Sequence, residues 1–412
     1  MQSLPFFSKK IPGTLIFLFL IWLMFFCTFT LGKYPQEGIL WLLERLNQFL
    51  ATILPQGMLY DFITNGVVNG VGSVLAFLPN ILILFFFMYT FEESGYLTHV
   101  AALLDNIMHK IGLHGNSVVP LLMGFGCNVP AVLATRFIPE FQRRILTMLL
   151  IPFMSCSARL PILVLLVGTF FPQYPILVIF GLYALAIVMA IFTAILLDKV
   201  FFKMPVDLTP VEVLPLKKPK IKRVLWLTWN AGYEYLKKIG TVVLIAMMAI
   251  WFLSSFPQNE KKQYVNEIAY QSPIENSTNN FQDNTYLARF GRFIEPALRP
   301  LGFDWKMSVC LVTGLAAKEF IVGTMAILYH AGEDNLENPH IGTHLKNAGV
   351  FTIPVVLSFL VFAMLYMPCI ATIYTIKKES GSWRWALFSV VYSIALAWII
   401  SFIVFRLASV LL

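Results

Sequence analysis

The sequence predicts an all-α protein that crosses a membrane several times. Of its 412 residues, 58% are hydrophobic and only 13% are charged, whereas soluble globular proteins carry about 25% charged residues. The apolar residues gather in runs of about 20, the length that a helix needs to span the hydrocarbon core of a bilayer. These runs predict about eight to ten membrane segments, and the number depends on whether the Gly-rich stretches cross the membrane or fold back.

The first half of the chain, residues 1–199, begins with a membrane span. The apolar run from Pro12 to Leu31 follows two lysines and lacks a small-x-small cleavage site, so we interpret it as a retained span and not as a signal peptide. An amphipathic interfacial helix, a span and a second amphipathic helix are predicted next, over residues 34–54, 74–91 and 97–111. Two more spans lie on either side of Pro172–Pro175.

A basic segment, residues 200–223, separates the two halves. Its cations cluster at Lys217, Lys218, Lys220, Lys222 and Arg223. Because cytoplasmic loops retain Lys and Arg, we predict that this segment is a cytoplasmic linker. The second half, residues 224–412, is predicted to begin with a span at residues 240–256 and an Asn-rich extracytoplasmic loop at residues 257–284. An interrupted apolar run at residues 305–329 and a polar connection at residues 330–347 follow. Two final spans are predicted at residues 351–376 and 386–412.

Polar and helix-breaking residues interrupt the apolar region between residues 112 and 161. Two glycines and a proline surround Cys127, and Ser155 and Ser157 flank Cys156. Backbone groups that such residues release at membrane depth are tolerated only where they are buried in protein or line a watery cavity. We therefore predict a site on broken or re-entrant helices. The alternative is that the small residues only allow close helix packing and that the cysteines are small core residues.

The two halves share a short pattern. Met154–Ala158 and Met367–Ala371 both read M-x-C-x-A. A Gly-marked interruption lies upstream of each, at Gly124–Pro130 and at Gly314–Glu319. Matching broken segments in corresponding halves indicate a transporter site at the interface of the repeats, so we predict two gate repeats.

Glu319 is the carboxylate that stands out within the apolar runs. An ionisable residue at membrane depth is by default a candidate for an ion path. The alternative is a salt bridge to Lys318, but adjacent residues of a helix point about 100° apart, which makes a direct pair awkward. Arg159 is expected to serve the structure, by pairing with a carboxylate or by capping carbonyls, because a cation in the path would repel the ion.

The motifs GFGCNVPAVLATR, LLIPFMSCSARLP, GLAAKEFIVGTMAILY and MPCIAT, together with FEESGYLTH and KKESGSWRWALFSVVY, resemble the membrane part of the FeoB ferrous-iron transporter family. The resemblance is collinear over nearly the whole chain. It implies two gate repeats and a path for Fe²⁺ across a bacterial inner membrane into the cytoplasm. The family's proposed metal-handling cysteines fall on Cys127, Cys156 and Cys369.

Weaker ligands are expected beside these cysteines. The candidates are Ser155, Ser157, Asn128, Met154 and Met367, with Glu319 as a further ligand. Fe²⁺ lies low in the affinity series of divalent metals, so geometry and ligand type must provide the selectivity. Cys27 and Cys310 lack polar neighbours, and we interpret them as packing residues.

The phosphate-binding motif G-x-x-x-x-G-K-[ST] does not occur in the sequence. The chain is therefore predicted to be a transporter and not an enzyme, with Fe²⁺ as its transported substrate and no tightly bound cofactor. Members of the resembled family usually carry a GTPase domain, so we expect that a separate GTPase subunit supplies this function, the alternative being that the path runs without it. A FeoA-like small protein is expected as a further partner, and a homo-oligomer is left open. The positive charge lies beside apolar spans, so it indicates the lipid bilayer and not nucleic acid as its partner.

Two other functions compete with iron transport. Gate-type repeats also resemble nucleoside carriers, so a secondary carrier for a small polar solute is one alternative. Such a site would need hydrogen-bonding groups and stacking aromatic rings, not three thiols on repeat-related segments. The other alternative is a non-transporting membrane scaffold that docks a GTPase, which would leave the cysteines and the intramembrane carboxylate without a role.

Overall fold

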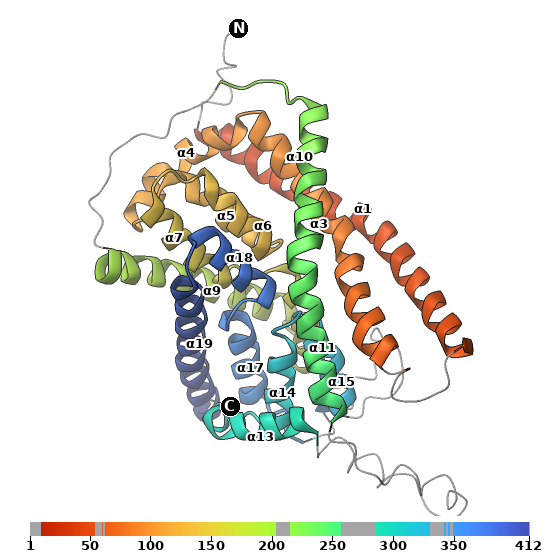
Figure 1. The fold of residues 1–412 in the computed structure, drawn as a ribbon. Coiled ribbons are helices and arrows are strands. Elements are labelled where there is room, and N and C mark those ends of the chain that lie inside the picture. Colours follow the sequence, from red (N-terminus) through yellow and green to blue (C-terminus); the bar gives the residue numbers. More distant parts are fainter. Residues whose placement is uncertain are drawn as a thin grey trace, which may run out of the picture. The chain divides into compact units, whose positions relative to one another are not determined.

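The described residues of the structure, a computed structural model, are mostly helical and contain no strand (Figure 1), so the prediction of an all-α polytopic membrane protein is confirmed. The structure describes residues 10–53, 60, 62–202, 215–256, 285–329, 342, 345–346 and 349–411. Part of the predicted linker, the whole predicted extracytoplasmic loop and most of the predicted polar connection lie outside these ranges.

Four segments of the described part are long and apolar enough to cross a membrane, and two of them, the first and the third, are interrupted by a short non-helical stretch. They are Phe141–Phe170, Pro175–Phe202, Ile353–Ser380 and Trp383–Leu411. A shorter apolar helix covers Leu244–Ser255. The total of about eight to ten segments, which includes broken and re-entrant ones, stays a prediction.

The chain forms two compact units, and each unit takes segments from both halves of the sequence. Unit 1 comprises residues 1–157, 184–244 and 371–390, and unit 2 comprises residues 158–183, 245–370 and 391–412. The predicted division into residues 1–199, a linker at residues 200–223 and residues 224–412 describes the sequence repeats and stays a prediction. The described end of that linker is partly helical, because α10 (Ile221–Glu234) begins within it.

In unit 1, α1 (Lys10–Ile53) packs along α3 (Asn69–Glu93), and α10 also packs on α3. The predicted boundary between a span and a separate interfacial helix near residue 33 is wrong, because α1 is one helix with Pro35 inside it. Proline removes one hydrogen bond of a helix, which membrane helices tolerate when a neighbour supports them. Here the Asn80 amide of α3 donates to the Gln36 side chain at 3.1 Å, directly beside the proline.

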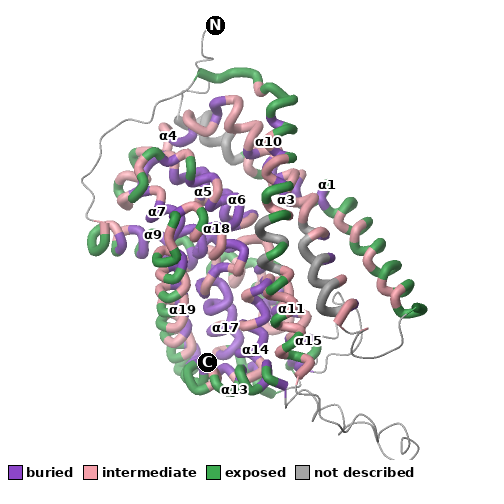
Figure 2. The backbone as a smooth tube through the Cα atoms, in the orientation of Figure 1, coloured by how far each residue is buried: buried purple, intermediate pink, exposed green. Residues whose placement is uncertain are grey.

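The rest of unit 1 consists of shorter helices. They are α4 (Tyr96–Lys110), α5 (Val118–Gly124), α6 (Asn128–Ala134), α7 (Phe141–Leu150) and most of α9 (Pro175–Leu197) and α18 (Ile370–Ser380). The predicted amphipathic helix over residues 97–111 corresponds to α4. Figure 2 shows that α5, α6 and α7 are largely buried, as a segment that carries freed backbone groups in a membrane must be.

Unit 2 has two largely buried helices, α14 (Trp305–Thr313) and α17 (Ile353–Leu365). Its other helices are α8 (Leu160–Phe170), α13 (Tyr286–Leu298) and α15 (Phe320–Leu328), with parts of α11 (Thr241–Ser255) and α19 (Trp383–Leu411). The Phe303 ring packs on Phe359 and Phe362, with centroids 5.4 and 5.7 Å apart. Cys310 in α14 is fully buried, in agreement with a packing role.

Candidate metal-handling site

The first break lies between α5 and α6 in unit 1. α5 ends at Gly124, and Cys127 has an extended backbone with φ −153° and ψ 130° before α6 begins. A Cβ atom at Gly124 would lie 2.7 Å from the Met154 Cβ, so only glycine lets Met154 approach this closely. The amide of Cys127 donates to Met123 at 3.1 Å and closes the turn.

A second non-helical stretch lies against the first. After α7 and a short 3₁₀ turn over Ile151–Phe153, the chain runs through Met154 to Cys156 without helix. Ser157 then donates twice to the Gly126 carbonyl, from its amide at 3.2 Å and from its hydroxyl at 3.0 Å. Gly126 precedes Cys127 and Ser157 follows Cys156, so one carbonyl joins the two stretches that carry these cysteines.

Asn128 adds an oxygen donor to this pair of stretches. Its side chain is 4% exposed, and its buried Oδ1 atom accepts no hydrogen bond from the described residues. Such an acceptor costs about 1–3 kcal/mol when it is left unsatisfied, and buried polar groups are satisfied in most proteins. Met154 and Ser155 are also buried. The two stretches of the first break therefore carry thiol, thioether and hydroxyl groups together with one unsatisfied amide oxygen.

The second break lies between α14 and α15 in unit 2, and a backbone hydrogen bond equivalent to that of Ser157 holds it. α14 ends at Thr313, Gly314 follows, and α15 begins only at Phe320. The amide of Ile370, the residue after Cys369, donates to the Leu315 carbonyl at 2.9 Å. In both halves, the residue after the cysteine thus donates to a carbonyl of the Gly-marked break, which supports the predicted gate repeats.

The salt bridge considered for Glu319 is not found in the described residues. The Lys318 ammonium instead donates to the Met367 carbonyl at 2.8 Å and lies 3.3 Å from the centroid of the Tyr366 ring. Glu319 is half-buried at the start of α15. Arg159 donates to the carbonyls of Met364 and Tyr366, so its expected carbonyl-capping role is confirmed.

Both breaks lie in the part of the chain that one family model matches. The model of the Gate family, described as nucleoside recognition, matches residues 74–170 and 236–383, which together form more than half of the chain. The chain belongs to the Gate family. A second model, described as ferrous iron transport protein B C terminus, matches residues 179–230. No solved structure matches the chain.

Several curated relatives of this Gate protein are named as iron transporters. The Fe(2+) transport protein A/Fe(2+) transporter FeoB fusion protein of Porphyromonas gingivalis is 40% identical over 97% of this chain and 50% of its own length. The Fe(2+) transporter FeoB of Campylobacter jejuni is 40% identical over 98% of this chain and 64% of its own length. That of Methanocaldococcus jannaschii is 36% identical over 95% and 56%. The predicted resemblance to the FeoB membrane part is confirmed, and the chain spans only part of each relative.

The structure groups the predicted ligands of this Gate protein into two sets. Unit 1 holds Cys127, Asn128, Met154, Ser155, Cys156 and Ser157, and unit 2 holds Glu319, Met367 and Cys369. Among the described residues, no three His, Cys, Asp or Glu side chains come together as a metal-holding group. That all three cysteines meet at one metal therefore stays a prediction. None of the five cysteines forms a disulfide.

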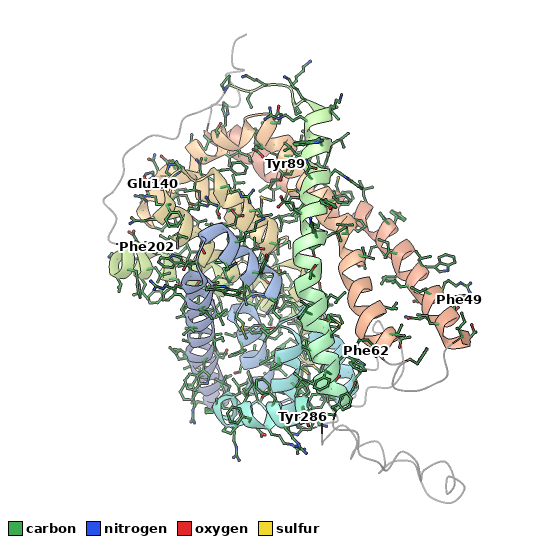
Figure 3. All side chains as sticks on the ribbon, in the orientation of Figure 1. Phe49, Phe62, Tyr89, Glu140, Phe202 and Tyr286 are labelled. Carbon is green, nitrogen blue, oxygen red and sulfur yellow. The ribbon has the colours of Figure 1, made fainter. Side chains whose placement is uncertain are left out.

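One ionic cluster was not predicted. Glu379 of α18 is only 4% exposed and accepts from Arg136 at 2.5 and 2.7 Å and from Arg144 at 2.7 Å. A second arginine of α7, the buried Arg143, donates to Glu140, which lies at the start of that helix (Figure 3). The sequence signal for the cluster was a single carboxylate directly after two lysines in the KKESG motif.

Proposed function

We propose that the chain carries Fe²⁺ across the bacterial inner membrane into the cytoplasm, along a path lined by Cys127, Cys156 and Cys369. The observation that carries this proposal is the first break, where one carbonyl joins the two cysteine-bearing stretches beside the unsatisfied oxygen of Asn128. The names of the relatives support the same substrate.

The chemistry of these groups fits a borderline ion that must also leave. Thiols and thioethers favour softer metals, and amide, hydroxyl and carboxylate oxygens favour harder ones, so a mixed set suits Fe²⁺ without binding it as tightly as a closed thiolate site would. Conduction requires binding that is strong enough for entry and weak enough for release. A set split between two breaks meets that requirement better than a closed four-ligand cage.

We propose that a GTPase outside this chain gates the path and that a FeoA-like small protein assists it. The phosphate-binding motif is not in the sequence, so the chain offers no predicted cradle for the phosphates and Mg²⁺ of GTP. The purified chain should therefore show no GTP turnover, and measurable turnover would contradict this part of the proposal.

The transport proposal is tested with the purified protein in vesicles and reduced radioactive iron. Cys127→Ser and Cys156→Ser should each lower the initial rate of Fe²⁺ uptake by roughly tenfold or more, since a hydroxyl is a far poorer ligand than a thiolate for this class of metal. Cys27→Ser and Cys310→Ser serve as controls and should retain uptake. Equal rates in all four variants at matched protein levels would remove the thiols from the path.

The description of the Gate family favours testing one other substrate class. A nucleoside carrier would take up a labelled nucleoside in the same vesicles and would not depend on Cys127 or Cys156. Nucleoside uptake without iron uptake would replace the iron proposal with the carrier alternative.

A further inference from the structure

Two buried cations of unit 2 bind carbonyls at the end of α17 and in the non-helical stretch between α17 and Cys369. Arg159 is 1% exposed and donates to Met364 and to Tyr366, the latter at 3.3 Å. Lys318 is 3% exposed and donates to Met367 at 2.8 Å. Cationic donors thus occupy three carbonyls within four consecutive residues.

Capping the end of a helix with a buried cation costs more free energy than capping it with a neutral group. The last carbonyls of a helix need partners, and positive charge there is favoured by the helix dipole. Water or a glycine turn can provide the same closure, whereas a buried charge is costly unless it is fully hydrogen-bonded. Two buried charges that bind the same short stretch therefore indicate that this stretch is held in one defined conformation.

At the first break, a serine hydroxyl makes the additional hydrogen bond that a cation makes at the second. There Ser157 follows the cysteine and uses both its amide and its hydroxyl to hold the opposite break. At the equivalent place in the second half stands Ile370, which has only its amide to donate. Lys318, which lies in the opposite break itself, provides the additional link through Met367.

We propose that Arg159 and Lys318 are positioning residues that fix the stretch from Tyr366 to Cys369 and so present the Cys369 thiol at a defined place. Their charge also shields the carbonyls of this stretch, because a dication is repelled where a cation already lies. The soft donors that this stretch presents to a metal are then the side chains of Met367 and Cys369. The consequence for transport rests on the proposed function, but the effect on the thiol does not.

The test compares the alkylation rates of individual cysteines in the purified full chain, resolved by mass spectrometry. Lys318→Met and Arg159→Met should change the rate at Cys369 by about tenfold, since hydrogen bonds from charged donors contribute on that scale, and should leave the rate at Cys156 unchanged. Lys318→Arg should restore the wild-type rate, because it keeps a charged donor. If Lys318→Met does not accumulate in the membrane, Lys318→Gln replaces it, and Cys369 should then react faster than in Lys318→Arg.

Lys306→Met is the matched control. Lys306 also lies in unit 2 and donates to a carbonyl, that of Leu328 at 2.9 Å, but this carbonyl belongs to the end of α15. The control should not change the rate at Cys369. Unchanged Cys369 rates in folded Lys318 and Arg159 variants, or an equal change in Lys306→Met, would overturn the positioning role.

Iron uptake gives a second readout. Lys318→Met should raise the Fe²⁺ concentration for half-maximal uptake, and Lys318→Arg should restore it. If the wild-type protein takes up no Fe²⁺, the proposed function fails, whereas the alkylation rates still decide whether the two cations position Cys369.

Discussion

Replacement of Glu379 by glutamine should destabilise the protein far more than replacement of a similar but exposed carboxylate. Glu379 is 4% exposed, and its arginine partners Arg136 and Arg144 are 53% and 22% exposed. Loss of one partner from a fully buried ion pair costs about 3–5 kcal/mol, and an exposed pair contributes about 0–1 kcal/mol. The intermediate exposure of this cluster places the expected loss at about 2–3 kcal/mol.

The matched control is Glu234→Gln. Glu234 accepts from Lys378, the neighbour of Glu379 on α18, at 3.1 Å, but Glu234 and Lys378 are 56% and 33% exposed. The expected loss is below about 1 kcal/mol. Both variants remove one carboxylate with almost no change in volume, so the difference between them reports burial.

The assay is thermal unfolding of the detergent-solubilised protein, followed by the fraction that stays monodisperse. A loss of 1 kcal/mol lowers the Tm by about 2–4 °C in a domain of 150–250 residues. Glu379→Gln should therefore lower the Tm by about 4–12 °C, and Glu234→Gln by less than about 4 °C and by less than half of the Glu379→Gln decrease. Equal decreases in both variants would refute the argument from burial.

Three further outcomes are expected. Asn128→Leu should lower Fe²⁺ uptake while it leaves the Tm unchanged or raises it, because it removes a buried acceptor that no described residue satisfies; a large loss of stability would contradict this. Glu319→Gln should weaken binding of Fe²⁺ to the purified chain, since it removes a charge but little volume, and unchanged affinity would exclude Glu319 from the path. A cysteine placed at Pro219 should be protected from an impermeant reagent in intact cells and one at Ser272 should react; the reverse would invert the topology.

Local patterns predicted the helices that depend on local chemistry. The hydrophobic spacing of residues 97–111 gave α4 to within one residue at each end. The glycine at residue 314 predicted the interruption that separates α14 from α15. The change from an apolar run to an amphipathic pattern misled the prediction for α1, because the helix continues through Pro35 beside Gln36, whose partner Asn80 is 44 residues away.

The same distinction applies to the candidate site. Gly, Pro and Ser around Cys127 and Cys156 marked the first break because they are unusual at membrane depth. The partner of Glu379 could not be inferred, because Arg136 is 243 residues away. The carbonyls that Arg159 caps are 205 and 207 residues away. Periodicity reports which residues share a face of one helix, and it contains no information about pairs that only the tertiary fold brings together.

The two breaks differ in charge, although each is held by an equivalent backbone hydrogen bond. No ionisable group other than the cysteine thiols lies in Gly124–Pro130 or Met154–Ser157. The second break contains the buried cation Lys318 and one carboxylate, Glu319, and the buried Arg159 binds the residues that precede Cys369. A dication approaching the second break meets a repulsion that Glu319 only partly offsets, and this repulsion is strong where water is excluded. Binding should therefore be tighter at the first break than at the second. In the proposed path the second break is then the weaker site, and conduction needs binding that is weak enough for release.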